Sequence, residues 1–301
     1  MQDTAKQKVV LIVNPISGTR RKLSKQVLTD AHLDRSKFDF EIVSTGYAGH
    51  AVEIAAESSG SGADIVVAVG GDGTVNEVAR GLAGTGTPMG IVPCGSGNGL
   101  ARHLGISMDP LTALRDLSQS HSTLIDYGIV NGHCFVTTCG LGFDALISQK
   151  FAEGKHRGEL EYIKNVLHQL HHYKPENYRM TLDGEPMETK AFLMTAANAN
   201  QWGNDAFIAP EASLQDGLLD VCIIRDAPIT ARPILLNMLL HKSLTKSSHY
   251  ICRKCSHLLI EREGDTLMHC DGDPVVVNGN IDIRIVRNGL AVMLPDRSCG
   301  V

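Results

Sequence analysis

The sequence has few aromatic residues and no excess of basic charge. Aromatic residues make up 5% of the 301 residues, with a single tryptophan, and 33 acidic residues against 28 lysines and arginines give a net charge of −5. Because phosphate backbones attract basic surfaces, this balance argues against a protein that binds nucleic acid through bulk electrostatics. It argues equally against a polybasic membrane anchor. No nucleic-acid partner is expected.

Long hydrophobic runs are also missing. The longest apolar cluster, residues 233–240, is far shorter than the ~20 residues that a membrane-spanning helix needs. The residues after Met1 contain no apolar leader, so we expect a soluble or peripheral protein of the cytoplasm. Among the eight cysteines only Cys252 and Cys255 have metal-site spacing, and no second such pair exists. Buried or incidental reduced thiols are expected rather than zinc.

The order of apolar segments predicts two domains. The first part alternates continuous apolar strands with helical stretches, which is typical of a mostly parallel sheet covered on both faces. After about residue 122, short β-like runs separated by turn residues predict a mostly antiparallel β domain. The expected boundaries are 1–125 and 126–301, and the last residues could pack back on the first domain. The strands expected in the first domain are 8–13, 38–44, 64–69 and 89–93.

Glycine-rich turns follow three of the predicted parallel strands, at 14–18, 70–74 and 94–99. In an open α/β sheet, ligands bind at the carboxyl ends of the strands, where such turns gather. Glycines let backbone N–H groups approach a polyphosphate closely, and the helix that follows presents its positive end. One such turn is explained by chain reversal alone, but three at equivalent strand ends predict a phosphate-binding site.

Two familiar phosphate motifs are excluded. The sequence has no GxxxxGK[ST] segment and therefore no P-loop, and the turn at 71–76 lacks the third glycine of a dinucleotide fingerprint. Asp72 inside that turn would repel a pyrophosphate unless a cation intervened. It therefore predicts magnesium between carboxylate and phosphates, or a proton-accepting role. A turn-capping aspartate is the alternative.

The turn Gly70, Gly71, Asp72, Gly73, Thr74 resembles the GGDGT motif of the diacylglycerol kinase and sphingosine kinase catalytic domain. GGDGT alone also occurs in NAD kinases, and a closely related motif occurs in phosphofructokinases. The full series of similar segments, from about residue 9 to 294, is more specific for the family. The other similar segments are NPxSG at 14–18, Thr45 with His50 and Ala51, the loop 93–102, GxGFDA at 140–145, IAP at 208–210, DGxLDV at 216–221, and DGD at 271–273 where the family has DGE.

This resemblance implies ATP and Mg²⁺ as cofactors, bound in a cleft between a NAD-kinase/phosphofructokinase-like α/β domain and a β domain. The residues that it implies around the nucleotide are Asn14, Ser17, Thr45, Gly70, Gly71, Asp72, Gly73, Thr74, Asn76, Gly95, Ser96 and Asn98. Glu77 could fix a ribose or loop amides, an ordinary first-turn carboxylate being the alternative. No lysine lies in these motifs, so Arg157, with Lys155, is our candidate for reaching the phosphates, unless it lies in a solvated loop.

Phosphoryl transfer also needs a proton acceptor for the attacking hydroxyl. The glutamate of the family's DGE matches Asp273, which is one methylene shorter. A base that is misplaced by one methylene can lower the reaction rate by orders of magnitude. Two assignments of the catalytic base therefore stay open, with Asp273 as the first choice and Asp72 as the second. Asp271 is expected to orient the loop or to contact the nucleotide.

The family also implies a magnesium site beside its IAP segment. By matching, its ligands would be the Asp216 carboxylate and the carbonyl groups of Ser213 and Leu218. Oxygen ligands from a turn suit magnesium. A plain Asp-Gly hairpin is the alternative.

The acceptor is expected to be a lipid hydroxyl, on diacylglycerol, a sphingoid base or a related lipid. Gly99 and Ser96 make the loop at 95–101 look closer to the GSGNxLA of sphingosine kinases than to the GTGND of diacylglycerol kinases. Asp144 falls where sphingosine kinases place an acidic residue near the head group, so the hypothesis leans toward a sphingoid acceptor. The apolar stretch 234–240 predicts transient contact with a membrane surface or a tail-binding cleft, a buried helix being the alternative. A homodimer is left open.

Two other functions stay open. A NAD-kinase-like enzyme with a soluble acceptor would share the GGDGT core, although the loop 93–102 and the segments after 208 argue against it. A catalytically weak nucleotide-binding regulator is supported only by the departure at Asp273.

Overall fold

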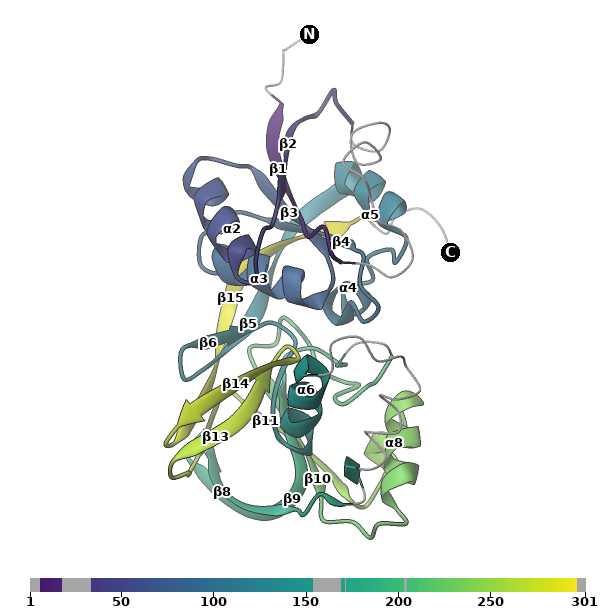
Figure 1. Ribbon diagram of the computed structural model, residues 1–301, viewed down its shortest axis with the longest axis vertical. Coiled ribbons are helices and arrows are strands. Elements are labelled where there is room, and N and C mark those ends of the chain that lie inside the picture. The colour runs from purple at the N-terminus through teal and green to yellow at the C-terminus, as the bar shows by residue number, and fades with distance from the viewer. Residues whose placement is uncertain (1–5, 18–33, 154–168, 171, 203–204, 297–301) are drawn as a thin grey trace. The chain divides into compact units, whose positions relative to one another are not determined.

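The computed structural model divides the chain into two compact units. Unit 1 comprises Met1–Ile125 and Asn288–Val301, and unit 2 comprises Asp126–Arg287. The chain passes between them within two long strands, β5 (Ser120–Val130) and β15 (Ile281–Pro295) (Figure 1). The residues that the structure describes are 6–17, 34–153, 169–170, 172–202 and 205–296.

Unit 1 is built on a parallel sheet in the order β2–β1–β3–β4. Both β3 and β4 are buried along their whole length, as expected of apolar strands with both faces covered. The end of β15 extends this sheet, parallel to β4, with Val292 opposite Met89. The bounds are β1 (Gln7–Val13), β2 (Phe38–Ser44), β3 (Ile65–Gly70) and β4 (Met89–Pro93).

Helices follow these strands and cover the sheet. In α3 (Asp72–Leu82) the buried Val75, Val78, Ala79 and Leu82 recur at helical spacing and form its core-facing side. Asp109 caps α5, accepting a hydrogen bond from Thr112 N, with proline at the first helical position. The remaining bounds are α2 (His50–Gly60), α4 (Gly99–His103), α5 (Pro110–Asp116) and η1 (Leu117–Gln119).

Strand register brings the loops after four strands to one edge of the sheet. Val13 at the end of β1 lies opposite Ser44 at the end of β2, and Val13 is also paired with Val69 of β3. Gly70 at the end of β3 lies opposite Pro93 at the end of β4. The loops that begin at Asn14, Thr45, Gly71 and Cys94 therefore leave the sheet side by side.

Unit 2 is an antiparallel sheet in the order β14–β13–β7–β9–β8–β12–β15, and β10 joins β9 to β11. β6 pairs with β5. The antiparallel β part expected after the α/β part is confirmed. The bounds are β6 (His133–Phe135), β7 (Thr138–Gly142), β8 (Glu176–Leu182), β9 (Glu185–Ala197), β10 (Leu219–Arg225), β11 (Tyr250–Cys255), β12 (His257–Ile260), β13 (Asp265–Cys270) and β14 (Asp273–Asn278).

The core of unit 2 lies on both faces of this sheet. Alternate residues of β10 enter different hydrophobic clusters: Val221 and Ile223 join one, while Cys222 joins the other, which also contains Leu235 and Leu239 of α8 (Arg232–Leu240). The helix α6 (Phe143–Glu153) lies beside the β13–β14 hairpin (Figure 1). Within the described part of the chain, no helix is long and apolar enough to cross a membrane.

Candidate functional site

The loops after β3 and β4 touch through their backbones. A Cβ added to Gly95 would lie 2.7 Å from the Cα of Gly71, and the Cys94 N–H donates a hydrogen bond to Gly70 O at 2.8 Å. Only glycine permits so close an approach. The two loops therefore form one continuous rim at the edge of unit 1.

Asp72 holds this rim together. Its Oδ2 accepts a hydrogen bond from Asn98 N and its Oδ1 one from Gly99 N, both at 2.7 Å. Hydrogen bonds to an ionised carboxylate are about twice as strong as neutral ones. Both oxygens thus face N–H donors, which balances the charge that the turn carries, and any proton-accepting role would weaken these contacts.

The loop between β4 and α4 is fixed by its own side chains. Asn98 is buried with φ 51°, its Nδ2 donates to Gly95 O at 2.6 Å, and its Oδ1 accepts from Gly95 N at 3.2 Å. Arg102 Nε donates to Gly97 O at 2.9 Å. Ser96 lies exposed between these anchored residues. These contacts hold the loop in a defined conformation.

The other predicted nucleotide residues of unit 1 lie along the same edge. Asn14 Nδ2 donates to Thr74 Oγ1 at 3.3 Å, and Asn14 Oδ1 accepts from Ile16 N. Ser17 N donates to Asn14 O, and Thr45 N donates to Val13 O. Thr74 is buried, so its hydroxyl braces Asn14 rather than facing solvent. In α3, Gly73 is exposed and Asn76 is buried.

Glu77 contacts loop amides. Its Oε1 accepts from Gly49 N at 2.8 Å and its Oε2 from Ala51 N at 3.1 Å. These N–H groups belong to the start of α2, where a helix leaves donors without intrahelical partners. The contact with loop amides expected for Glu77 is present, and the contact with a ribose stays a prediction.

In unit 2, Asp271 and Gly272 form the two-residue turn between β13 and β14. Their φ values of 49° and 90° are those of a type I′ hairpin, for which Asp-Gly is a preferred pair. The Asp271 carboxylate accepts hydrogen bonds from the N–H groups of residues 136, 137 and 138, at 2.8 to 2.9 Å, and from the Thr137 hydroxyl. Asp271 thus anchors the loop before β7, while Asp273 is exposed beside the turn.

Behind this turn lies a buried polar cluster. Asp144 is 7% exposed, and its Oδ2 accepts a hydrogen bond from Thr195 Oγ1 at 2.6 Å and lies 2.8 Å from His269 Nε2. In the neutral ring His269 Nδ1 accepts from Gly272 N at 3.2 Å, so the imidazole joins α6 to the hairpin turn. Burial disfavours the charged ring, but the Asp144 carboxylate outweighs burial and raises the pKa of His269.

Sequence reasoning missed His269 and Thr195. Both occupy strand positions between apolar residues, in Leu267-Met268-His269-Cys270 and in Leu193-Met194-Thr195-Ala196. A polar side chain in such a run signals a buried polar contact, because buried polar groups are hydrogen-bonded. Their partner, Asp144, lies 51 residues before Thr195 along the chain, so the sequence alone does not reveal the pairing.

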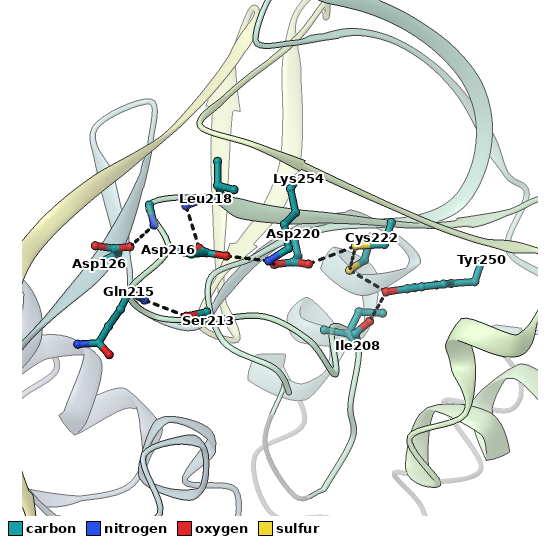
Figure 2. A network of polar contacts seen from close by, with 12 residues as sticks. Asp126, Ile208, Ser213, Gln215, Asp216, Leu218, Asp220, Cys222, Tyr250 and Lys254 are labelled. Carbon is teal, nitrogen blue, oxygen red and sulfur yellow. Dashed lines mark hydrogen bonds and ion pairs between the residues drawn. The ribbon is translucent and has the colours of Figure 1, made fainter.

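In the turn expected to bind magnesium, the ammonium group of Lys254 lies beside the Asp216 carboxylate (Figure 2). Asp216 Oδ1 accepts from Leu218 N at 3.0 Å, and its Oδ2 lies 2.7 Å from Lys254 Nζ. Lys254 also lies 3.2 Å from Asp220 Oδ2. Ser213 lies in the same turn, where its Oγ accepts from Gln215 N.

The donors in this turn are hard oxygens, which suit magnesium. A cation at Asp216 would nevertheless have to displace Lys254, so the arrangement as it stands does not fit a metal bound to that carboxylate. In the described ranges, no group of three or more His, Cys, Asp or Glu side chains could hold a metal ion. Cys252 and Cys255 pack into clusters on opposite faces of β11, which explains why their spacing makes no zinc site. Arg157 and Lys155 lie outside the described residues.

Two family models match almost the whole chain. Residues 8–130 match the diacylglycerol kinase catalytic domain, and residues 137–293 match the YegS C-terminal NAD kinase beta sandwich-like domain. The chain belongs to the diacylglycerol kinase catalytic-domain family. The predicted resemblance is confirmed, and with it membership of a lipid kinase family that uses ATP.

The chain is similar to diacylglycerol kinases of several bacteria. The diacylglycerol kinase of Bacillus subtilis (strain 168) is 28% identical over 274 residues, 87% of this chain and 88% of the relative. That of Mycobacterium tuberculosis (strain ATCC 25618 / H37Rv) is 28% identical over 302 residues, 96% of this chain and 95% of the relative.

Solved structures share the fold. The structure of a diacylglycerol kinase from Bacillus anthracis str. Sterne superposes with a TM-score of 0.75 at 22% identity, covering 97% of this chain and 98% of that one. An NAD kinase from Archaeoglobus fulgidus in complex with ATP gives a TM-score of 0.54 at 14% identity, covering 97% and 95%. The NAD-kinase-like fold expected from the sequence is confirmed.

Proposed function

We propose that this protein transfers the γ-phosphoryl group of ATP to the hydroxyl group of a diacylglycerol-type lipid. The observation that carries the proposal is the preformed rim of unit 1, in which four loops leave one sheet edge and Asp72 joins two of them. Membership of a lipid kinase family supports a lipid as acceptor.

In this proposal the rim binds the triphosphate. Exposed Gly73 lies in the first turn of α3, so backbone N–H groups and the positive end of that helix are available to phosphate oxygens. Ser96 is exposed on an anchored loop and would donate from the other side. Asn14, Ser17 and Thr45 would contact the remainder of the nucleotide. ATP would enter as its magnesium complex, which offsets phosphate charge during transfer.

Asp273 is the proposed base. It is exposed next to a turn that Asp271 and His269 hold in place, and it matches the glutamate of the family's DGE motif. A proton accepted by Asp72 would weaken the two hydrogen bonds that hold the rim together. The lipid hydroxyl oxygen would attack the γ-phosphorus, its proton would pass to the Asp273 carboxylate, and ADP would leave with the electron pair of the broken P–O bond.

The state of Asp144 favours diacylglycerol over a sphingoid base. The hypothesis of a sphingoid acceptor relied on this carboxylate meeting an ammonium head group. Asp144 is buried, and Thr195 and His269 occupy its Oδ2. A neutral hydroxyl lipid needs no such partner, and the named relatives are diacylglycerol kinases.

The proposed substrate lies in a membrane, and α8 and the residues before it expose large apolar side chains. Ile229, Ile234 and Leu240 are 48%, 61% and 50% exposed, although Leu235 and Leu239 on the same helix are buried. The segment 227–249 contains no acidic residue and has Lys242 and Lys246 in a chain of net charge −5, whereas its Arg232 is buried and donates to backbone carbonyl groups. We call Ile229, Ile234, Leu240, Lys242 and Lys246 the α8 surface and propose that it contacts anionic lipid.

An acceptor panel tests the proposed function. Purified protein with Mg²⁺ and γ-labelled ATP is offered diacylglycerol, sphingosine or NAD in parallel, and the labelled product is identified by mass spectrometry. Phosphatidic acid as the dominant product is expected. Label on sphingosine would overturn the choice of acceptor, and label on NAD alone would overturn the lipid kinase proposal.

A further inference from the structure

Two thiols face each other across neighbouring strands of unit 2. Cys222 of β10 is directly opposite Cys252 of β11 in the antiparallel register, and their sulfur atoms lie 3.9 Å apart. Cys222 is fully buried, whereas Cys252 is partly exposed. The proposed kinase activity uses neither thiol.

Neighbouring groups make the two thiols unequal (Figure 2). Tyr250 OH donates to Cys222 Sγ at 3.1 Å, Cys222 donates to Cys252 Sγ, and Cys252 donates to Asp220 Oδ1 at 3.4 Å. The hydrogen bond from Cys222 lowers the pKa of Cys252, while burial raises the pKa of Cys222 well above its usual value. The accessible thiol is thus the more acidic one, which favours its reaction as a thiolate.

We propose that Cys222 and Cys252 form an oxidation site that reacts with a hydroperoxide and closes a cross-strand disulfide. Directly opposite residues of antiparallel strands have Cα atoms about 4.5–5.5 Å apart, within the range of about 4.4–6.8 Å found in disulfides. The sulfur atoms need to approach each other by roughly 1.9 Å, which rotation of the two side chains can supply.

The chemistry balances in two steps. The Cys252 thiolate attacks the terminal peroxide oxygen, breaks the O–O bond and becomes a sulfenic acid, and the displaced oxygen takes a proton and leaves as water from hydrogen peroxide or as an alcohol from an alkyl hydroperoxide. Cys222 then attacks the Cys252 sulfur and displaces hydroxide, which takes up the Cys222 proton and leaves as water. Two thiols lose two electrons, and one hydroperoxide is reduced.

Oxidation would also change the polar network around Asp220. The disulfide removes the S–H group that Cys252 donates to Asp220 Oδ1, and the Lys254 ammonium group, 3.2 Å from Asp220 Oδ2, remains as the charge facing that carboxylate. Because Lys254 is shared with Asp216, the change reaches the 216–218 turn. The oxidation site is therefore connected to a segment that the family resemblance singled out.

A second cysteine pair supplies the matched control. Cys139 of β7 and Cys270 of β13 are also directly opposite each other, but both are buried. Burial raises the pKa of Cys139 well above its usual value. This pair has the register of a disulfide without an accessible, acidic thiol, so it should resist oxidation.

The test is peroxide treatment of the folded, full-length protein, followed by alkylation and non-reducing peptide mapping. We expect a linked peptide pair containing Cys222 and Cys252, reversed by dithiothreitol, with Cys139 and Cys270 alkylated as free thiols. Cys252→Ala should slow peroxide-dependent thiol loss roughly tenfold or more, since the acidic thiol is removed. Cys139→Ala should react like the wild type.

A second variant keeps the test decisive if Cys252→Ala fails to fold. In Cys222→Ala the sulfenic acid on Cys252 has no resolving thiol and should be trapped by dimedone. The proposal is overturned if the wild type forms no Cys222–Cys252 link while its thiols remain intact. It is overturned equally if the buried Cys139 and Cys270 pair oxidises first.

Discussion

Three acidic side chains of the candidate site accept hydrogen bonds from backbone N–H groups of other segments. Asp72 joins two loops, Glu77 holds the start of α2, and Asp271 anchors the loop before β7. Asp273 is the exposed acid at the hairpin. The sequence alone did not distinguish between Asp72 and Asp273 as base, because residue type is the same and only their surroundings differ.

Removing the charge of Asp72 should loosen the rim. In Asp72→Asn an amide N–H₂ faces one of the two N–H donors, and we expect a loss of about 2–4 kcal/mol in unfolding free energy. ATP affinity should fall as well, because the loops that bind phosphate separate. Urea unfolding and calorimetric ATP titration measure both quantities. Asp109→Asn, which keeps an N-cap oxygen on α5, is the matched control.

Unchanged stability and unchanged ATP affinity in Asp72→Asn would contradict the bracing role. A loss of transfer with ATP binding intact would instead return Asp72 to the position of base.

The buried contact between His269 and Asp144 should make stability depend on pH. The folded pKa of His269 is raised above 6.5, so its contribution is complete below that pH and is lost as pH rises through the folded value. The stability difference between wild type and His269→Gln should therefore be larger at about pH 6 than at about pH 9. Thermal unfolding across this range measures it, with His133→Gln at an exposed position as control.

A stability difference that is constant across pH would show that the imidazole contributes only packing.

At the scale of elements, strands of unit 1 were predictable almost to the residue. The expected 38–44 and 89–93 coincide with β2 and β4, because short runs that contain Phe, Ile and Val and are bounded by turn residues are strong local signals. Pairing in unit 2 was not predictable. β13 joins β7, about 130 residues earlier, and no local pattern encodes that contact.

The Asp216 turn provides a prediction about metal. Lys254→Met leaves Asp216 and Asp220 without their shared cation and should cost about 1–3 kcal/mol, since Lys254 and Asp216 are partly exposed but Asp220 is buried. Magnesium should then stabilise the variant but leave the wild type unchanged, because Lys254 occupies the carboxylates. Thermal unfolding in EDTA and in MgCl₂ distinguishes the two. Lys190→Met, which removes a surface ion pair with Asp226, is the control.

A wild type that loses stability in EDTA would mean that magnesium displaces Lys254, and the correspondence with the family's metal turn would be restored.

At the scale of the whole molecule, the fold class and the family were predictable from the sequence, but the acceptor was not. The hypothesis of a sphingoid acceptor rested on the residue types of the loop 95–101 and on Asp144 in the GxGFDA segment. The sequence cannot show that Asp144 is enclosed by Thr195 and His269, since both come from distant strands. Burial of one carboxylate therefore changed the favoured acceptor.

The α8 surface predicts lipid binding that does not depend on catalysis. Ile234→Ser combined with Leu240→Ser should weaken sedimentation with phosphatidylglycerol vesicles roughly tenfold, because less apolar area enters the lipid. Val276→Ser removes an equally exposed apolar side chain from β14 and should have no effect. Since neither ATP nor acceptor is present, the outcome is separate from the kinase proposal. Equal binding by both variants would rule out this surface.

The most direct test of the central claim is phosphatidic acid production from ATP and diacylglycerol by wild type and Asp273→Ala, with ATP affinity measured on the same preparations. The account predicts product from the wild type, a fall in kcat of roughly 100-fold or more in the variant, and the same ATP affinity in both. Full activity in Asp273→Ala, or ATP binding without any phosphorylated lipid in the wild type, would contradict it.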